Sequence, residues 1–373
     1  MTKKIFFLGL VVYLVAAGGG YLGYGLLAKP ATDLKSPLFE KPPVVNFSAV
    51  SAPTTTCPLN GVQTTKDQAD LWYNRRPLAV MLENHVDARP QWGLSKADII
   101  YEAVAEGGIT RFLAIFFCQD AEDIAPIRSS RVYYLDWAQE YNPIYVHVGG
   151  ANTAGPADAL TQIITYGIKN LDEIVVGFPT FWRGPERPAP HNVHSTTKNL
   201  WEEGLRRGWS RTDQSDEAWD KSFRMWKFKE DAPQASRPVS SSVGISFWKA
   251  FADYNVTWTY DAKTNLYKRT SGLAKHVDAL TQEQLTGKVI LVQFTRERSA
   301  DDSYPGNIHL LYGTVGDGRT LIFQDGKTIE GRWSKIDKKS KTIFIDKAGK
   351  EIEFNRGQIW IEVVPEAASI TYN

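Results

Sequence analysis

The chain has 373 residues, 43% of them hydrophobic and 23% charged, a composition typical of globular proteins and unlike that of disordered chains. Lysine and arginine (43) nearly balance aspartate and glutamate (42), so no basic surface of the kind that binds nucleic acid is expected. The length favours two modest domains once any non-globular segments are set aside.

An uncharged, apolar segment runs from Ile5 to Ala28. Its length suits a bilayer core of about 30 Å at about 1.5 Å per residue, and Lys3 and Lys4 precede it, which keeps the N-terminus in the cytoplasm. A cleaved signal peptide is the alternative, but its apolar region is usually shorter, about 7 to 15 residues. No cysteine directly follows the segment, so lipid attachment is not expected. The sequence therefore predicts one uncleaved transmembrane anchor within residues 1–28, with all later residues outside the cytoplasm.

Residues 29–70 begin with a stretch rich in Pro, Thr, Ser and Val and are expected to form an extended stalk. From residue 71 to residue 210, apolar strands alternate with helical patterns, which is typical of an α/β layered domain. The expected strands are 78–82, 98–105, 111–117, 144–148 and 173–176, and the expected helices are 129–141, 153–166 and 196–207.

Residues 211–373 have a different character, because short apolar strands follow one another with turn residues between them. The segments 256–260 and 266–270 flank a turn and predict a hairpin. Further strands are expected at 289–294, 308–312, 319–323, 342–345 and 358–363. The sequence thus predicts an α/β layered N-terminal ectodomain followed by a mostly β C-terminal domain.

The two cysteines, Cys57 and Cys118, allow at most one disulfide. Cys57 lies in a Pro- and Thr-rich stretch, whereas Cys118 ends an apolar strand. These unlike surroundings favour two unpaired thiols over a disulfide.

Three arginines stand at strand ends or at the start of an expected helix: Arg111, Arg128 and Arg131. The guanidinium group is a planar, permanently charged donor that suits phosphate and carboxylate, and Ser129 with the helix N-terminus adds further donors. An anion-binding site is one interpretation. The alternative is that Arg128 and Arg131 pair with Asp136 or Glu140 on the helix surface.

Glu83, Glu102 and Glu106 end or flank apolar segments, where a carboxylate is costly to bury unless it is paired. They are candidates for proton transfer or for binding a metal, or partners of the same arginines. His147 ends a strand and is followed by two glycines, which let the backbone approach a ligand closely. Glu106 and His147 are therefore the expected proton carriers.

The histidines His191 and His194 have a spacing that metal sites use, but a third ligand is not evident and Pro190 indicates a loop. No metal is expected, and the sequence leaves the cofactor unknown. The GxSxG, P-loop and HExxH motifs are absent from the sequence, so whether the protein is an enzyme stays open.

Several long motifs resemble the bacterial YerB family. They are residues 76–85 (Arg-Pro-Leu-Ala-Val-Met-Leu-Glu-Asn-His), 88–90, 93–102, 106–112, 126–131, 147–150 and 190–192, together with 321–333 and 359–365 towards the C-terminus. The resemblance implies a lipoprotein-like envelope protein without an established activity. Asn84, His85, His191 and Asn192 lie within these motifs and complete the expected ligand-binding set. Lipid-anchored members would carry a lipobox cysteine where this chain has its apolar segment.

The order of segments 110–116, 127–131, 149–150 and 166–174 also looks like the layout of the LytR-CpsA-Psr phosphotransferases. That likeness implies a polyprenyl pyrophosphate held by Arg111 with Arg128 or Arg131. The Arg-x-Asp-Thr and Pro-Arg-Asp signatures of that family are missing here, which removes its metal-binding aspartates, and a shared layout does not carry function.

The leading hypothesis is a cell-envelope protein that binds an anionic or glycan ligand, such as a cell-wall glycan or a polyprenyl phosphate, in an arginine-lined cleft. One alternative is a non-catalytic module that binds a protein partner. The other is a phosphoryl or glycosyl transferase at the membrane surface.

Overall fold

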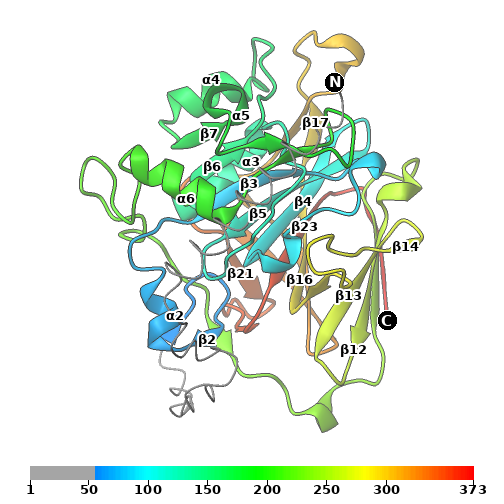
Figure 1. The fold of residues 1–373 in the computed structure, drawn as a ribbon. Coiled ribbons are helices and arrows are strands. Elements are labelled where there is room, and N and C mark those ends of the chain that lie inside the picture. Colours follow the sequence, from blue (N-terminus) through cyan, green and yellow to red (C-terminus); the bar gives the residue numbers. More distant parts are fainter. Residues whose placement is uncertain (1–54) are drawn as a thin grey trace, which may run out of the picture. The chain divides into compact units, whose positions relative to one another are not determined.

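The computed structural model describes residues 55–373 (Figure 1). The expected transmembrane segment at residues 5–28 and the first part of the expected stalk lie outside the described residues. Within residues 55–373, no helix combines the length and the apolar character that crossing a bilayer requires. This described part is mostly β with few helices, which confirms the coarse fold class expected from the sequence.

The largest element is a ten-stranded mixed sheet with the order β21-β20-β19-β16-β23-β4-β5-β3-β6-β7. Its strands are β3 (Leu78–Glu83), β4 (Ile99–Glu106), β5 (Ile109–Phe116), β6 (Ile144–His147), β7 (Asn170–Asp172), β16 (Val289–Thr295), β19 (Gly316–Gln324), β20 (Lys327–Lys335), β21 (Ile343–Asp346) and β23 (Ile359–Pro365). β23 pairs in parallel with both β16 and β4, so strands from the two halves of the chain share one sheet. Strands from both sides of the domain boundary expected near residue 210 are therefore hydrogen-bonded in one sheet.

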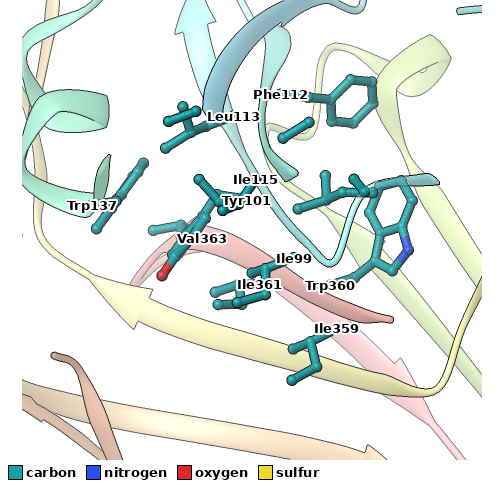
Figure 2. Close-up of a cluster of buried hydrophobic side chains, with 14 of the residues drawn as sticks. Ile99, Tyr101, Phe112, Leu113, Ile115, Trp137, Ile359, Trp360, Ile361 and Val363 are labelled. Carbon is teal, nitrogen blue, oxygen red and sulfur yellow. The ribbon is translucent and has the colours of Figure 1, made fainter. Parts of the chain in front are cut away.

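The central strands of this sheet are buried on both faces, as their near-continuous apolar sequences require. Because side chains alternate along a strand, Tyr101 of β4 and Phe112 of β5 point to opposite sides. Tyr101 stacks on Trp137 with ring centroids 5.6 Å apart, and Phe112 meets Trp360 edge-on at 5.8 Å. Figure 2 shows these two layers of the core, with Trp137 beside Tyr101 and Phe112 on the side of Trp360.

Few helices accompany the sheet: α2 (Lys66–Asp70), α3 (Val132–Ala138), α4 (Ala159–Thr165), α5 (Glu173–Val176) and α6 (Thr197–Arg206). All seven residues of α3 are buried. The hydroxyl of Tyr134 donates to the carbonyl oxygens of Ala103 (3.0 Å) and Arg111 (2.7 Å), which fixes α3 against β4 and β5. α3 therefore covers the face to which Tyr101 points.

The opposite face is covered by a six-stranded sheet with the order β14-β13-β12-β11-β24, in which β15 also pairs with β13. Its strands are β11 (Ser242–Ser246), β12 (Val256–Asp261), β13 (Leu266–Ser271), β14 (Ala274–Lys275), β15 (Thr286–Gly287) and β24 (Ser369–Tyr372). Residues of β12 alternate between buried and exposed, as in a sheet with one solvated face. Trp258 of β12 meets Trp360 of β23 with centroids 5.1 Å apart, and this contact joins the two sheets.

The remaining strands are short pairs. They are β1 (Thr55–Thr56) with β2 (Gln63–Thr64), β8 (Trp182–Arg183) with β9 (Val193–His194), β10 (Phe228–Lys229) with β22 (Phe354–Asn355), and β17 (Glu297–Ser299) with β18 (Leu310–Tyr312).

Several expected elements start elsewhere or have another type. The strand expected at 173–176 is wrong, because Asp172 caps a helical turn there by accepting a hydrogen bond from the amide of Ile174 (3.1 Å). The helices expected from residues 129 and 153 begin at Val132 and Ala159. Residues 55–70, which the sequence places in the stalk, form β1, β2 and α2 instead.

The cysteines are paired, so the expectation of two unpaired thiols is wrong. Cys57 and Cys118 form a disulfide with their Cα atoms 6.1 Å apart and a sequence separation of 61. The Pro- and Thr-rich stretch around Cys57 folds against the end of β5, where the side-chain amide of Asn60 donates to Asp98 (2.7 Å) and the indole of Trp72 donates to the carbonyl of Cys118 (3.2 Å). Composition alone does not reveal such tertiary contacts.

Candidate functional site

The three arginines singled out in the sequence come together at one edge of the ten-stranded sheet. Arg111 of β5 lies directly opposite Glu83 of β3 in the antiparallel register. The segment that leads into α3 runs beside them, because the amide of Arg128 donates to the carbonyl of Met81 (2.9 Å). We call Arg111, Arg128, Arg131, Glu83, Glu106 and His191 the arginine cluster.

Each arginine of the cluster has a carboxylate partner. Arg111 Nη2 lies 3.1 Å from Glu106 Oε2, and Arg131 pairs with the other oxygen of Glu106. Arg128 Nε lies 3.2 Å from Glu83 Oε1. The partners are therefore Glu83 and Glu106, not the Asp136 or Glu140 that the alternative interpretation named.

The cluster also holds the preceding loop and a histidine. Arg111 Nη1 donates to the carbonyl oxygen of Ser129 (2.9 Å), which positions the residue between Arg128 and Ser130. Glu83 Oε2 lies 3.0 Å from His191 Nδ1. Glu83 thus bridges Arg128 and His191 and brings the loop before β9 to the cluster.

Charge and burial in the cluster are unevenly distributed. Three guanidinium groups share two carboxylates, which leaves a positive excess when His191 is neutral. Arg111 is almost fully buried, whereas 25% of the Arg128 side chain is exposed. The Nε atom of Arg131 is buried and has no hydrogen-bond partner among residues 55–373, and burial lowers the pKa of Arg131 below its ordinary value. An anion next to Arg131 would offset that loss of solvation.

His85 packs on His191 with ring centroids 5.2 Å apart. The Nδ1 atom of His85 accepts a hydrogen bond from the amide of Asp87 (3.2 Å), and ligand atoms of His85, Asp87 and His191 all lie within 4.8 Å of one another. His194 is elsewhere, because its two ring nitrogens contact Asp123 (2.8 Å) and Glu186 (2.6 Å). The expected absence of a metal remains a prediction.

His147 is not brought to the arginines. It is fully buried, with Nδ1 2.7 Å from the carbonyl of Gly149 and Nε2 3.2 Å from the amide nitrogen of Asn170. Nδ1 therefore carries the proton and Nε2 accepts a hydrogen bond from the side-chain amide of Asn170, so the His147 ring is neutral. Burial lowers the pKa of His147, while Asp172 acts in the opposite direction. The role of His147 as a proton carrier stays untested; here it holds the turn that follows β6.

Two further residues of the expected site have internal partners. Asn192 accepts from Arg183 (3.1 Å) and donates to the carbonyl of Gly184 (2.9 Å), which closes the loop between β8 and β9. Asn84 is buried and donates to Glu102 Oε1 (3.1 Å) and Thr110 Oγ1 (2.7 Å). Asn84 thus belongs to a buried polar network on the other face of the sheet.

This network was missed from the sequence. Arg269, Glu102 and Glu362 have completely buried side chains, with Arg269 in contact with Glu102 and Arg269 Nη1 2.8 Å from Glu362 Oε1. Burial, reinforced by Glu102, holds the pKa of Glu362 well above its ordinary value. The signal was available: Glu362 interrupts an apolar strand, and the two-residue period of β13 places Arg269 on its buried face beside Tyr267 and Ser271.

A cavity of about 580 Å³ begins at Val132, directly after Arg131. Its wall includes Tyr133, Tyr166, Arg296, Arg298, Tyr312 and Lys338. Lys338 Nζ lies 3.4 Å from Asp136 and 4.4 Å from the ring centroid of Tyr166. Arg296 is exposed. The sequence pattern did not indicate this cavity, because its lining comes from segments far apart along the chain.

Comparison with known proteins gives a consistent result. Two family models match the chain: "Protein of unknown function (DUF3048) N-terminal domain" over residues 60–210 and "Protein of unknown function (DUF3048) C-terminal domain" over residues 245–361. The protein named "Putative lipoprotein YerB" of Bacillus subtilis (strain 168) is 31% identical over 321 residues, which cover 84% of this chain and 88% of that relative. The crystal structure of YerB from Bacillus subtilis matches with a TM-score of 0.71 at 28% identity and covers 85% of this chain and 100% of that one.

Proposed function

This chain belongs to the YerB family, and from that membership we propose that it is a cell-envelope protein that binds an anionic or glycan ligand through the arginine cluster. The family resemblance of the sequence motifs is confirmed by the comparisons. Because both family models describe proteins of unknown function, the proposed ligand rests on the residues of the cluster and of the cavity that begins at Val132.

The proposed location is the outer side of the cytoplasmic membrane. The relative carries the name "Putative lipoprotein YerB", and lipoproteins are tethered to a membrane; residues 5–28 of this chain are uncharged and apolar. A phosphatase reporter that is active only outside the cytoplasm, fused to Asn373, should be active in cells. Activity of a cytosolic reporter alone at the same position would contradict this location.

The observation that carries the proposal is that three guanidinium groups converge on two carboxylates. Of the three arginines, Arg128 and Arg131 have more solvent contact than Arg111, with 25% and 11% of their side chains exposed against 7%. Ser129 lies between them in the chain. A phosphate or carboxylate would add charge-assisted hydrogen bonds to both arginines and balance the excess positive charge. Arg111, which is almost fully buried, would position Glu106 and Ser129 without contacting the ligand.

The neighbouring cavity suits the remainder of such a ligand. It has room for a sugar-sized group, and Tyr166 and Tyr312 provide aromatic surface while Arg296 and Lys338 provide positive charge. Aromatic rings with nearby polar groups are a common lining for glycan sites. Together the cluster and the cavity favour a ligand with an anionic group joined to a sugar or a similar polar body.

Isothermal calorimetry on the full chain in detergent tests the site, with a water-soluble pyrophosphate-bearing lipid analogue as the probe. The double substitution Arg128→Ala with Arg131→Ala should weaken binding by about 100-fold or more, since hydrogen bonds to charged groups contribute about 1.5–3 kcal/mol each. Inorganic pyrophosphate serves as a second probe and separates recognition of the anion from recognition of the lipid part.

A matched control is available on α6, where Arg206 and Arg207 share one carboxylate, Glu203, as Arg111 and Arg131 share Glu106. The substitutions Arg206→Ala and Arg207→Ala remove the same charge and should leave the affinity within about twofold. Equal affinity of the Arg128/Arg131 double variant and the unsubstituted chain would reject the arginine cluster as the site.

A further inference from the structure

The disulfide between Cys57 and Cys118 lies at the wall of an open cavity of about 430 Å³. The same wall includes Asn60, Trp72, Arg75 and Lys96. The two sulfur-bearing residues are unequally accessible, because Cys57 is fully buried while Cys118 is partly exposed. An attacking thiol from solution therefore has access to Cys118 but not to Cys57.

Asp98 lies next to the disulfide and is completely buried. Its Oδ2 accepts hydrogen bonds from the amides of Phe117 (2.7 Å) and Cys118 (2.9 Å). Its Oδ1 accepts from Asn60 (2.7 Å) and lies 3.8 Å from Cys57 Sγ. The carboxyl group is thus held by the backbone of one cysteine and directed at the sulfur of the other.

Burial raises the pKa of Asp98 to about 7, with the amide donors and Arg75 acting in the opposite direction. Arg75 is the charged group that lowers the pKa of Asp98, and it is itself paired with Asp120 (2.7 Å). Lys96 lines the same cavity. Near neutral pH, Asp98 exchanges a proton readily.

We propose that the Cys57–Cys118 pair is a redox-active disulfide that exchanges two electrons with a dithiol partner, and that Asp98 is the proton carrier for Cys57. The partner is defined by its chemistry, a protein or small molecule with two neighbouring thiols. The activity is separate from ligand binding at the arginine cluster.

The exchange proceeds in two steps. A thiolate of the partner attacks Cys118 Sγ, a mixed disulfide forms, the bond between Cys118 and Cys57 breaks, and the leaving Cys57 thiolate takes the proton of Asp98. The second thiolate of the partner then attacks the partner's first sulfur, which is bonded to Cys118 in the mixed disulfide. Cys118 leaves as a thiolate that takes a proton from solvent. The partner is oxidised to a disulfide and this chain is reduced to a dithiol. In the reverse direction, the Asp98 carboxylate takes the proton of the Cys57 thiol, and the resulting thiolate attacks the mixed disulfide.

The test measures reduction of the native full chain by dithiothreitol between pH 5.5 and 8.5, followed by alkylation with a maleimide that shifts the band on a gel. Rates are compared for the unsubstituted chain and Asp98→Asn. We expect the unsubstituted chain to react about tenfold faster or more at pH 6, where Asp98 carries a proton to give, since a positioned acid contributes about 10²–10⁴-fold. The ratio should fall towards one or below as the pH rises past about 7 and Asp98 becomes an anion. Asp120→Asn, on the same cavity, should stay within about twofold of the unsubstituted chain.

A ratio that does not change with pH would overturn the role of Asp98. Reduction that occurs only as fast as the chain unfolds globally would show a purely structural disulfide and overturn the proposal. Two single variants keep the test independent of whether Asp98→Asn folds. With oxidised glutathione, Cys57→Ser should form a mixed disulfide at Cys118 at least about tenfold faster than Cys118→Ser forms one at the buried Cys57. Equal rates would contradict the assignment of the attacked sulfur.

Discussion

Arg269 lies on the buried face of β13 and is enclosed by aromatic rings. Its guanidinium carbon lies 4.7 Å from the ring centroid of Trp360, 5.2 Å from that of Trp258 and 5.6 Å from that of Phe112. Nε donates to His276 (3.0 Å), so His276 is a neutral acceptor at Nδ1. Every polar atom of this side chain therefore has a partner inside the protein, which is the condition under which a buried charge is tolerated.

Replacing Arg269 should expose the energetic role of this arrangement. Arg269→Met leaves the acidic side chains of Glu102 and Glu362 buried without a cation, so the free energy of unfolding should fall by about 3–5 kcal/mol. Urea denaturation followed by tryptophan fluorescence measures the change. Lys268→Met is the matched control, because Lys268 precedes Arg269 on β13 but is 46% exposed and pairs with Asp261 at the surface; it should change the free energy by less than about 1 kcal/mol. Similar losses in both variants would contradict a special contribution of the buried cation.

For single residues, the sequence indicated which side chains gather at the site better than it indicated which of them pair with one another. Arg111, Arg128 and Arg131 each flank an apolar strand or a helix start, so their meeting at one sheet edge was predictable. Their pairing with Glu83 and Glu106 was one of the open interpretations and is confirmed; it stayed open because strand register and the path of the loop before α3 are not determined by local sequence. The burial of His147 and Asn84 was missed for the same reason, since both depend on segments far away in the chain.

At the level of elements, strands with long apolar runs were the most predictable. β3, β5 and β16 were expected within one or two residues of their observed bounds, and the hairpin of β12 and β13 was expected from its turn and its alternation. Burial on both faces leaves a clear apolar signal. Two of these strands, β3 and β5, carry Glu83 and Arg111 of the arginine cluster.

Short elements were less predictable, because a single cap or turn decides them. Residues Glu173–Val176 contain three β-branched side chains, which favour a strand, but the cap from Asp172 and the left-handed Gly177 (φ +62°) produce the helical turn α5. Gly316 and Gly318 lie within β19 although glycine is typical of turns, while Asp325 and Gly326 form the turn between β19 and β20. Local propensity is a weak guide where tertiary pairing supplies the stabilisation.

The molecule as a whole is organised around a sheet to which both halves of the chain contribute. Residues 55–373 belong to one compact unit, and β23 joins β16 on one side and β4 on the other. The two family models match separate parts of the chain. The first match ends at residue 210 and the second begins at residue 245. The hydrogen bonding of the sheet is therefore continuous between the two segments that the family models match separately.

This arrangement leads to a prediction about fragments. Residues 1–210 and 211–373, produced separately, should each lack a cooperative unfolding transition, since separation leaves the inner edges of β4 and β23 unpaired and uncovers the apolar face around Phe112, which packs against Trp360 of the other fragment. Circular dichroism during urea titration measures this, and mixing the two fragments should restore the transition. A full chain cut after folding in the exposed segment 214–215 is the control and should keep its transition. Cooperative unfolding of either fragment alone would instead support independent domains.

The position of β23 also has a consequence for the order in which the protein is made. The ribosome releases β4 long before residues 359–365 exist, so the newly made first half presents a long apolar strand edge while the rest of the chain is still being translated. Pairings between such distant residues form slowly, and edges that wait for them are prone to join other chains. Production of this protein is therefore expected to depend on whatever shields that edge until the last 15 residues of the sequence are made.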